Sequence, residues 1–223
     1  MTNIQNLGVT LIDPDATYIS SKDINDITFG EGCIVHPGVY LVGSIYIGEE
    51  SIIGPNCTLM NVRIGQHTTI LNSTISNSSI GAQCQIGPYA LIEDSNLEDE
   101  VTIGFTAQIK RSTIGKQSVA KHHCYIGDTQ MGERVNIGAG AITGNYGGMS
   151  KNKTIIGDGA FIGINVNLIA PVTIGRESYL GAGAIIKKNV LPHAVVVGLD
   201  RVLNHKKSYR MRKGWVLCDH QIR

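Results

Sequence analysis

The 223-residue sequence is poor in aromatic and charged side chains, which make up 5% and 17% of the chain. It has no apolar run near the ~18 residues of a membrane-spanning helix, and its N-terminus lacks the pattern of a secretory signal peptide. Its formal net charge of +1 gives no global field that favours nucleic acid or an anionic membrane surface. We therefore expect a cytoplasmic protein whose partners include neither nucleic acid nor a membrane.

The five cysteines are odd in number and include no Cys-x-x-Cys motif, so the sequence predicts no disulfide framework. Four of them, Cys33, Cys57, Cys84 and Cys124, each follow an apolar residue by four places. A small inward-facing side chain suits these positions in a regular repeat. We interpret the four as buried hydrophobic residues and not as nucleophiles or metal ligands.

Glycine is abundant, with 27 residues, and it repeatedly follows an aliphatic residue at intervals close to six. Such pairs include Ile47-Gly48, Ile53-Gly54, Ile80-Gly81, Ile86-Gly87, Ile137-Gly138 and Ile162-Gly163. A period of six fits neither an amphipathic helix nor an alternating strand, but it is typical of hexapeptide repeats, in which three short parallel strands form each triangular coil. We predict an all-β fold, a parallel β-helix whose left-handed winding is implied by similarity to known hexapeptide-repeat proteins.

The repeat divides the chain into three parts. We expect residues 1–26 to form a leader packed on the first coil, residues 27–197 to form the β-helix, and residues 198–223 to form a C-terminal tail. This tail is basic, with seven Lys and Arg against two Asp. Its Tyr209 and Trp215 favour an ordered extension over a nucleic-acid-binding arm, and a solvated, frayed end is the alternative.

A β-helix wall is a scaffold, so we expect chemistry where the repeat fails. One irregular segment, AKHHCY at 120–125, places two histidines side by side. If the segment is extended, His122 and His123 face opposite ways, and one of them can serve a groove as a general base, because imidazole is largely neutral above pH ~6.5. The alternative is that both are surface polar residues. Adjacent side chains diverge, so we predict no metal site here.

The other irregular segment, NYGGMSKNK at 145–153, interrupts the repeat and carries Lys151 and Lys153. Lys110 and Arg111 precede the two histidines by about one coil. Cations gathered near a groove suit an anionic ligand such as a phosphate. The alternative for each of them is a solvated side chain.

Several stretches carry a specific likeness to a known family. They are GVTLIDPDATYI (8–19), IKRSTIGKQSVAKHHCYIGD (109–128), VNIGAGAITGNYGG (135–148), KTIIGDGAFIG (153–163), LIAPVTIG (168–175) and KGW (213–215). Over almost its whole length the chain resembles the acetyltransferase domain of the bifunctional N-acetylglucosamine-1-phosphate uridyltransferase/glucosamine-1-phosphate acetyltransferase family. That family lies within the hexapeptide-repeat acyltransferase superfamily, and the NIGAG and NY motifs are the most specific part of the likeness.

The resemblance implies a homotrimer of β-helices with active sites between subunits, acetyl-CoA as the cosubstrate and an amino-sugar phosphate as the acceptor. It implies that His122 is the base that takes a proton from the attacking amine. The positions that match the family's acceptor site are Lys110, Tyr125, Asn136 and Lys151. The positions that match its acetyl-CoA site are Ala139, Asn145, Tyr146, Ile164, Ala182 and Arg201. The 145–153 segment would close over the groove of a neighbouring subunit.

The sequence departs from the family at three points. The uridyltransferase domain is not part of this sequence, so we expect acetyl transfer alone. Glu93 stands where the family has an Arg that helps hold the acceptor phosphate, and a carboxylate repels a phosphate. Ile164 replaces a Ser along the CoA path, and Arg201 is the nearest match to a late Arg of the family.

These observations predict an acetyl-CoA-dependent N-acetyltransferase of the hexapeptide-repeat type. The acceptor classes that we consider are an amino sugar, a sugar phosphate and a nucleotide-linked amino sugar. The prediction rests on His122 and on the residues retained around it. The alternative is a non-catalytic β-helical scaffold or regulatory subunit of a nucleotide-sugar enzyme, which the changes at Glu93 and Ile164 favour.

Overall fold

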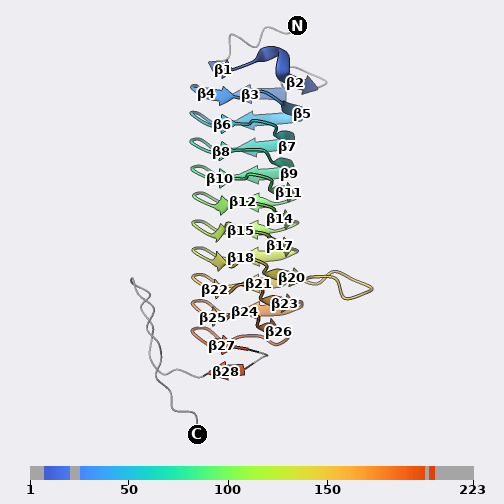
Figure 1. The fold of residues 1–223 in the computed structure, drawn as a ribbon, viewed down its shortest axis with the longest axis vertical. Helices are drawn as coiled ribbons and strands as arrows, with labels where there is room; N and C mark the ends of the chain where they lie inside the picture. The colour runs from blue at the N-terminus through green and yellow to red at the C-terminus, as the bar shows by residue number, and fades with distance from the viewer. Residues whose placement is uncertain (1–7, 21–25, 199–200, 204–223) are drawn as a thin grey trace.

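The strands of this protein wind into a tall, narrow prism, with β1 near one end and β27 near the other (Figure 1). The structure is a computed structural model that describes residues 8–20, 26–198 and 201–203. Among the described residues, the named strands pair in parallel, except that β27 and β28 pair antiparallel. The predicted all-β, left-handed parallel β-helix is confirmed. No helix within the described ranges has the length and apolar character needed to span a membrane.

One face of the prism is a single sheet of twelve strands. In spatial order these are β1 (Val9–Leu11), β4 (Cys33–Val35), β6 (Ile52–Ile53), β8 (Thr69–Ile70), β10 (Gln85–Ile86), β13 (Thr102–Ile103), β16 (Val119–Ala120), β19 (Asn136–Ile137), β22 (Phe161–Ile162), β25 (Tyr179–Leu180), β27 (Val195–Val197) and β28 (Arg201–Leu203). A short 3-10 helix, η2 (Pro14–Ala16), follows β1.

The other two faces share a second sheet, because its early strands run around the corner between them. β9 pairs with both β11 and β12, for example. The early strands are β2 (Thr17–Ser20), β3 (Ile27–Phe29), β5 (Val39–Ile47), β7 (Thr58–Ile64) and β9 (Thr74–Ile80). The second face continues with β11 (Leu91–Glu93), β14 (Ala107–Lys110), β17 (Cys124–Gly127), β20 (Ile142–Gly144), β23 (Asn167–Ile169) and β26 (Ile185–Ile186). The third face continues with β12 (Asn96–Leu97), β15 (Thr113–Ile114), β18 (Thr129–Met131), β21 (Thr154–Ile156) and β24 (Val172–Ile174).

A nearly constant coil length sets residues above one another, since most coils repeat after 16 to 18 residues. Thr102 pairs with Val119 and Val119 pairs with Asn136, so these coils repeat after 17 residues. The next coil is longer, because Asn136 pairs with Phe161, 25 residues further on. The eight additional residues fall in the 145–153 segment, which forms a hairpin-like loop that projects from the prism between β20 and β21 (Figure 1). The stacking is therefore uninterrupted on either side of this loop.

The core consists of columns of aliphatic side chains that run along the prism. Ile75, Ile92, Ile109 and Ile126 are in register on successive coils, and each is at most 1% exposed. The four cysteines of the repeat are buried as predicted. Burial raises the pKa of the Cys124 thiol to about 12, which leaves very little thiolate at neutral pH. The interpretation of these cysteines as small hydrophobic residues is confirmed.

The Ile-Gly pairs contain glycine because adjacent coils lie too close together for a side chain at that position. A Cβ atom on Gly138 would lie 2.6 Å from the carbonyl carbon of Gly163 on the next coil. Such a contact is shorter than carbon atoms tolerate, so a side chain would separate the coils. A column of buried hydroxyls joins the coils at another corner, where the Ser95 amide donates to Ser78 Oγ, and the Ser112 amide donates to Ser95 Oγ, both over 3.0 Å.

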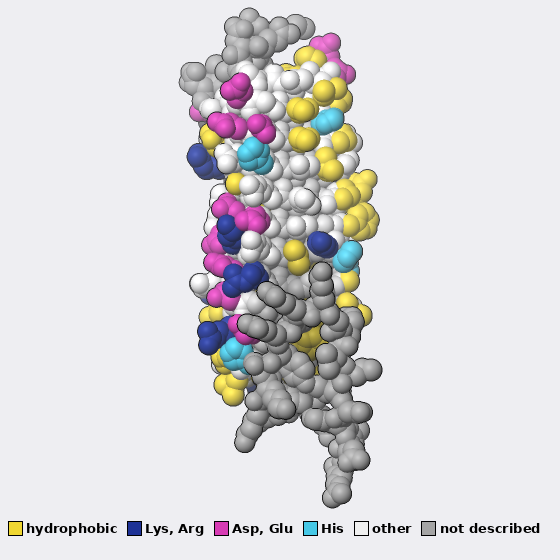
Figure 2. Space-filling model, turned by 90° about the vertical axis from the view of Figure 1, so that its left-hand side faces the viewer, with side chains coloured by type: hydrophobic (Ala, Val, Ile, Leu, Met, Phe, Trp, Pro, Cys, Tyr) yellow, Lys and Arg dark blue, Asp and Glu magenta, His cyan; other side chains and the backbone are white. Residues whose placement is uncertain are grey.

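The two ends of the chain differ in how they join the prism. β1 pairs with β4 and β2 pairs with β5, so parallel stacking extends from the repeat back to Val9. The expected basic tail, 198–223, lies largely outside the described residues. Its described part is Gly198 and β28, which adds an antiparallel strand to β27. Figure 2 shows acidic and basic side chains interspersed along one side of the prism and hydrophobic side chains gathered beside them.

We expect Ile86→Ala to lower the free energy of unfolding by about 2–5 kcal/mol, because Ile86 is buried between Ile70 and Ile103 on the adjoining coils. Urea unfolding measures this change. Gln85→Ala is the matched control, since Gln85 precedes Ile86 in β10 and points outward. Equal losses in the two variants would contradict the inward and outward assignment of this strand.

Candidate active site

The corner between the second and third faces carries a column of polar side chains. Asn77, Asp94, Arg111 and Asp128 follow one another at 17-residue intervals, each with a positive φ of 48–50°. Asn77 Nδ2 donates to Asp94 Oδ1 over 3.2 Å. Asn and Asp tolerate this left-handed backbone, whereas an Arg there is unusual. The column leads to Asn145, where the projecting loop begins.

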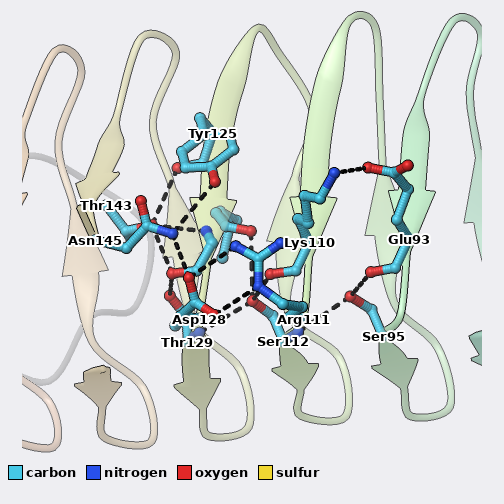
Figure 3. A network of polar contacts seen from close by, with 12 residues as sticks. Glu93, Ser95, Lys110, Arg111, Ser112, Tyr125, Asp128, Thr129, Thr143 and Asn145 are labelled. Carbon is cyan, nitrogen blue, oxygen red and sulfur yellow. Dashed lines mark hydrogen bonds and ion pairs between the residues drawn. The ribbon is translucent and has the colours of Figure 1, made fainter. Parts of the chain in front are cut away.

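Arg111 and Asp128 form the best-defined ion pair of this column. Arg111 Nε and Nη2 donate to the two carboxylate oxygens of Asp128 over 2.7 and 2.8 Å (Figure 3). Asn145 Nδ2 donates to the same carboxylate and, over 3.3 Å, to Tyr125 Oη. The hydrogen bond from Arg111 lowers the pKa of Asp128, and that from Asn145 adds to the effect. The same bond raises the pKa of Arg111, so both groups are charged at neutral pH.

Gly127 makes room for this network. A Cβ atom on Gly127 would lie 2.5 Å from Tyr125 Oη and 2.7 Å from Asn145 Nδ2. Any side chain at this position would therefore displace both polar groups. The backbone of Gly127 is held from the next coil, where Thr143 Oγ1 accepts from its amide over 2.7 Å. The YIGD sequence thus fixes Tyr125 and Asp128 relative to each other.

A cleft of about 370 Å³ opens on the second face beside the network. Its lining residues come from β11, β14 and the corner that follows it, β17 and the projecting loop. They are Leu91, Glu93, Gln108, Ile109, Lys110, Arg111, Tyr125, Asn145, Tyr146 and Lys151. Tyr146 and Lys151 face each other across an antiparallel bridge at the base of the loop. The cleft therefore brings together five of the residues assigned to the acceptor and acetyl-CoA sites: Lys110, Tyr125, Asn145, Tyr146 and Lys151.

Lys110 has an ion-pair partner in the cleft wall. Glu93 and Lys110 are in register on β11 and β14, and the ammonium group contacts Glu93 Oε2 (Figure 3). Lys151 and Lys153, which the sequence analysis placed near one anionic ligand, lie on different sides of the corner. Lys151 lines this cleft, whereas Lys153 lines a second hollow of about 440 Å³ that lies across the corner and includes Asp94 and Asp128.

Four other predicted residues form a second column at a different corner. The register of the flanking strands places His122, Ala139, Ile164 and Ala182 at equivalent positions on successive coils. The amide of Asn165 donates to the Ala139 carbonyl over 2.8 Å, which ties two of these coils together. This corner column begins three residues before Tyr125, and none of its four residues lines the cleft.

The remaining predicted residues lie apart from the cleft. Asn136 is half-buried on β19, on the first face, three residues before Ala139. Arg201 is in β28, and its side chain lies outside the described residues. His122 and His123 are both exposed at a bend between β16 and β17, so they do not alternate as residues of an extended strand would. In this chain His122 does not line the cleft, although Tyr125 does.

Asp128 is the main residue of the site that the sequence analysis did not single out. Its position in the sequence could have identified it. Asp128 stands 17 residues after Arg111 and 17 before Asn145, so the three residues occupy the same corner on successive coils. Among the described residues, no three His, Cys, Asp or Glu side chains are grouped so that they could hold a metal ion.

Two models of known families match the chain. A model described as bacterial transferase hexapeptide (six repeats) matches residues 26–61 and 153–188, and a model described as GlmU-like, C-terminal hexapeptide matches residues 54–137. The chain belongs to the GlmU-like hexapeptide-repeat family. The bifunctional protein GlmU of Geobacillus sp. (strain WCH70) is 45% identical over 203 residues, which are 91% of this chain and 43% of that protein.

A second GlmU, from Halalkalibacterium halodurans, is 42% identical over 92% of this chain and 44% of its own length. The chain thus spans less than half the length of these curated GlmU relatives. Among solved structures, UDP-N-acetylglucosamine O-acyltransferase (LpxA) from Moraxella catarrhalis is 19% identical, covers 86% of this chain and 70% of its own, and has a TM-score of 0.47. A likeness this distant carries no information on function.

We expect Asp128→Asn to lower the free energy of unfolding at pH 7 by about 1–3 kcal/mol, because it removes a charge-assisted hydrogen-bonded pair. The folded-state pKa of Asp128 is lowered, so the contribution of its carboxylate is complete above the unfolded value near ~3.9 and is lost as the pH falls through the folded-state pKa. Urea unfolding of both proteins from pH 7 to pH 3 tests this. The difference between them should narrow below about pH 4.

Glu133→Gln is the control for that series, because Glu133 and Arg134 form an ion pair at an exposed position. Its effect should be small, since exposed pairs contribute little. A difference between wild type and Asp128→Asn that stayed constant over the whole pH range would contradict the charged state assigned to Asp128.

Proposed function

We propose that this protein transfers an acetyl group from acetyl-CoA to the amine of an amino sugar, a sugar phosphate or a nucleotide-linked amino sugar. The observation that carries the proposal is the cleft on the second face, where Lys110, Tyr125, Asn145 and Tyr146 lie together. Membership of the GlmU-like family supports it, as does the 45% identity to the Geobacillus protein.

The corner column that begins at His122 is the proposed path of acetyl-CoA. Ala139, Ile164 and Ala182 repeat along it at the ~4.8 Å spacing of parallel strands, so together they span about 10 Å. Their backbone amides donate to no other described residue, so they are available to a ligand. Ile164 is 53% exposed and would offer the ligand an apolar contact in place of a hydroxyl.

The residues of the site suit attack by an amine on a thioester. The neutral nitrogen of the acceptor forms a bond to the carbonyl carbon, and the carbon–sulfur bond of the thioester then breaks. His122 takes the proton that the nitrogen loses, and the CoA sulfur leaves and is protonated. The unengaged amide of Ala139 is one donor that can stabilise the negative charge on the carbonyl oxygen of the intermediate.

The site as proposed is completed by a second copy of the chain. His122 does not line the cleft of its own chain, and the loop that carries Lys151 projects away from the prism (Figure 1). Large apolar side chains are exposed on the prism, among them Tyr89, Phe105 and Ile142. A homotrimer would cover such side chains and would bring the loop of one subunit to the His122 corner of the next.

A non-catalytic scaffold is the competing proposal. Two observations favour it, namely that Lys110 is engaged by Glu93 within the wall and that Ile164 offers no hydroxyl to a cofactor. The two proposals differ in whether the protein binds acetyl-CoA and releases its thiol. A scaffold would do neither.

We expect purified protein to release thiol from acetyl-CoA in the presence of an amino-sugar acceptor, and His122→Ala to reduce kcat by about 10²–10⁴-fold through loss of the general base. His123→Ala is the matched control, because His123 is the adjacent imidazole and is also exposed. Its rate should stay close to that of wild type.

Acetyl-CoA alone should also raise the melting temperature, since a ligand at about 100 times its Kd stabilises the folded state by about 2.7 kcal/mol. Absence of both turnover and a thermal shift would reject the transferase and leave the scaffold. Equal losses in the two histidine variants would reject His122 as the base. Light scattering of the same samples measures the mass, and a monomeric, active protein would reject the trimer.

A further inference from the structure

We propose that Glu93 determines the acceptor, and that the acceptor is an amino sugar with no phosphate on the part that contacts Lys110. The inference rests on the proposed function and narrows its three acceptor classes to one. It follows from the charge balance of the cleft wall, where the cations have partners within the protein.

The Glu93–Lys110 pair is built into the wall by the strand register. The two residues are Cα partners on β11 and β14, and their side chains extend toward each other along the outer surface of the sheet (Figure 3). They are 31% and 38% exposed, so both reach the cleft and are partly shielded from water. A ligand at this position meets a carboxylate and an ammonium group side by side.

The second cation of the wall is engaged as well. Both carboxylate oxygens of Asp128 accept hydrogen bonds from Arg111, so this guanidinium already has a bidentate partner. Lys151 is the one cleft-lining cation without a carboxylate partner among the described residues, and it lies on the projecting loop and not on the wall. Its charge acts on Asp128, whose pKa it helps to lower.

A phosphate at Lys110 would therefore approach the Glu93 carboxylate without a free cation on the wall to offset it. Repulsion between the Glu93 carboxylate and the phosphate would weaken binding of a phosphorylated ligand relative to an uncharged one. To accommodate the phosphate, the Glu93–Lys110 pair would have to separate and leave the carboxylate beside the anion. The wall is thus arranged against an anion at this position.

An uncharged sugar meets suitable groups at the same place. Glu93 Oε2 contacts Lys110, which leaves Oε1 to accept from a hydroxyl, while the ammonium group donates to a neighbouring hydroxyl oxygen. Leu91, Gln108 and Tyr125 are in register on the three coils beside this pair and line the same cleft. They offer an apolar surface, an amide and a phenol to one face of a sugar ring.

The test compares acceptors and not overall rates. Thiol release gives kcat/KM for glucosamine, glucosamine-1-phosphate and a UDP-linked amino sugar with wild type, Glu93→Gln and Glu93→Arg. We expect wild type to prefer glucosamine over its phosphate by at least about tenfold. Glu93→Gln should weaken that preference, and Glu93→Arg should reverse it in favour of the phosphate.

Glu100→Arg is the matched control. Glu100 and Lys116 form a similar pair between neighbouring coils, with Lys116 Nζ 3.0 Å from Glu100 Oε1, and neither lines the cleft. This variant makes the same change of net charge, so its ratio of kcat/KM values should stay within about twofold of wild type. Thermal melting of every variant confirms that each one is folded.

The outcomes separate this inference from the proposed function. A wild type that prefers glucosamine-1-phosphate or the UDP-linked sugar, with a ratio that Glu93→Arg leaves unchanged, would overturn the inference while the transferase stands. If no acceptor is acetylated and acetyl-CoA gives no thermal shift, the proposed function fails. Calorimetric titration with each sugar then tests the inference alone, and it is overturned if glucosamine does not bind more tightly than its phosphate.

Discussion

The stacking of one coil directly on the next is the constraint on which the rest of this structure depends. Parallel pairing sets the distance between coils, and the inward aliphatic columns, such as Ile75, Ile92 and Ile109, are buried only while the register holds. Around the cleft the coil length is 17 residues, so residues 17 positions apart in the sequence become vertical neighbours. Residues that are distant in sequence, such as Glu93 and Lys110, become contacts because they occupy the same position on adjacent coils.

The same constraint decides where an irregular segment can be inserted. Eight additional residues inside a strand would move the rest of the coil out of register with its neighbours, whereas at a corner they leave the ladders on both sides intact. The projecting loop leaves the prism after β20, and regular pairing resumes at once where Thr154 meets Thr129. The loop therefore begins at the corner that already holds Asp128 and Arg111, and this places Tyr146 and Lys151 beside the cleft.

The six-residue period predicted the fold because periodicity is a property of the chain alone. It also predicted the burial of Cys33, Cys57, Cys84 and Cys124, since inward positions recur at fixed steps. The site was predicted only in part, because the resemblance supplied the residues but not their partners. Glu93 was expected to oppose a substrate phosphate, and the structure gives it a partner in Lys110.

Other features depend on details that a repeat pattern does not carry. The exposure of both His122 and His123 comes from the bend between β16 and β17, where the extended alternation assumed from the sequence does not apply. The role of Asp128 depends on side-chain hydrogen bonds that its carboxylate accepts from both Arg111 and Asn145. The side chain of Arg201 lies outside the described residues, so its assignment remains a prediction from the resemblance.

A column of stacked residues also couples substitutions between coils. Lys110 is retained at a position that the resemblance assigns to the acceptor, yet its charge is opposed by a residue 17 positions earlier. If each position were compared with the family by itself, Lys110 would count as a matching site residue and Glu93 as a separate change. In the wall they are one unit, because removing the acidic partner alters what the ammonium group can bind. The binding role of a residue in a β-helix therefore depends on the residues stacked above and below it. The acidic side chain of Glu93 changes which ligand Lys110 can bind, although Lys110 itself is unchanged.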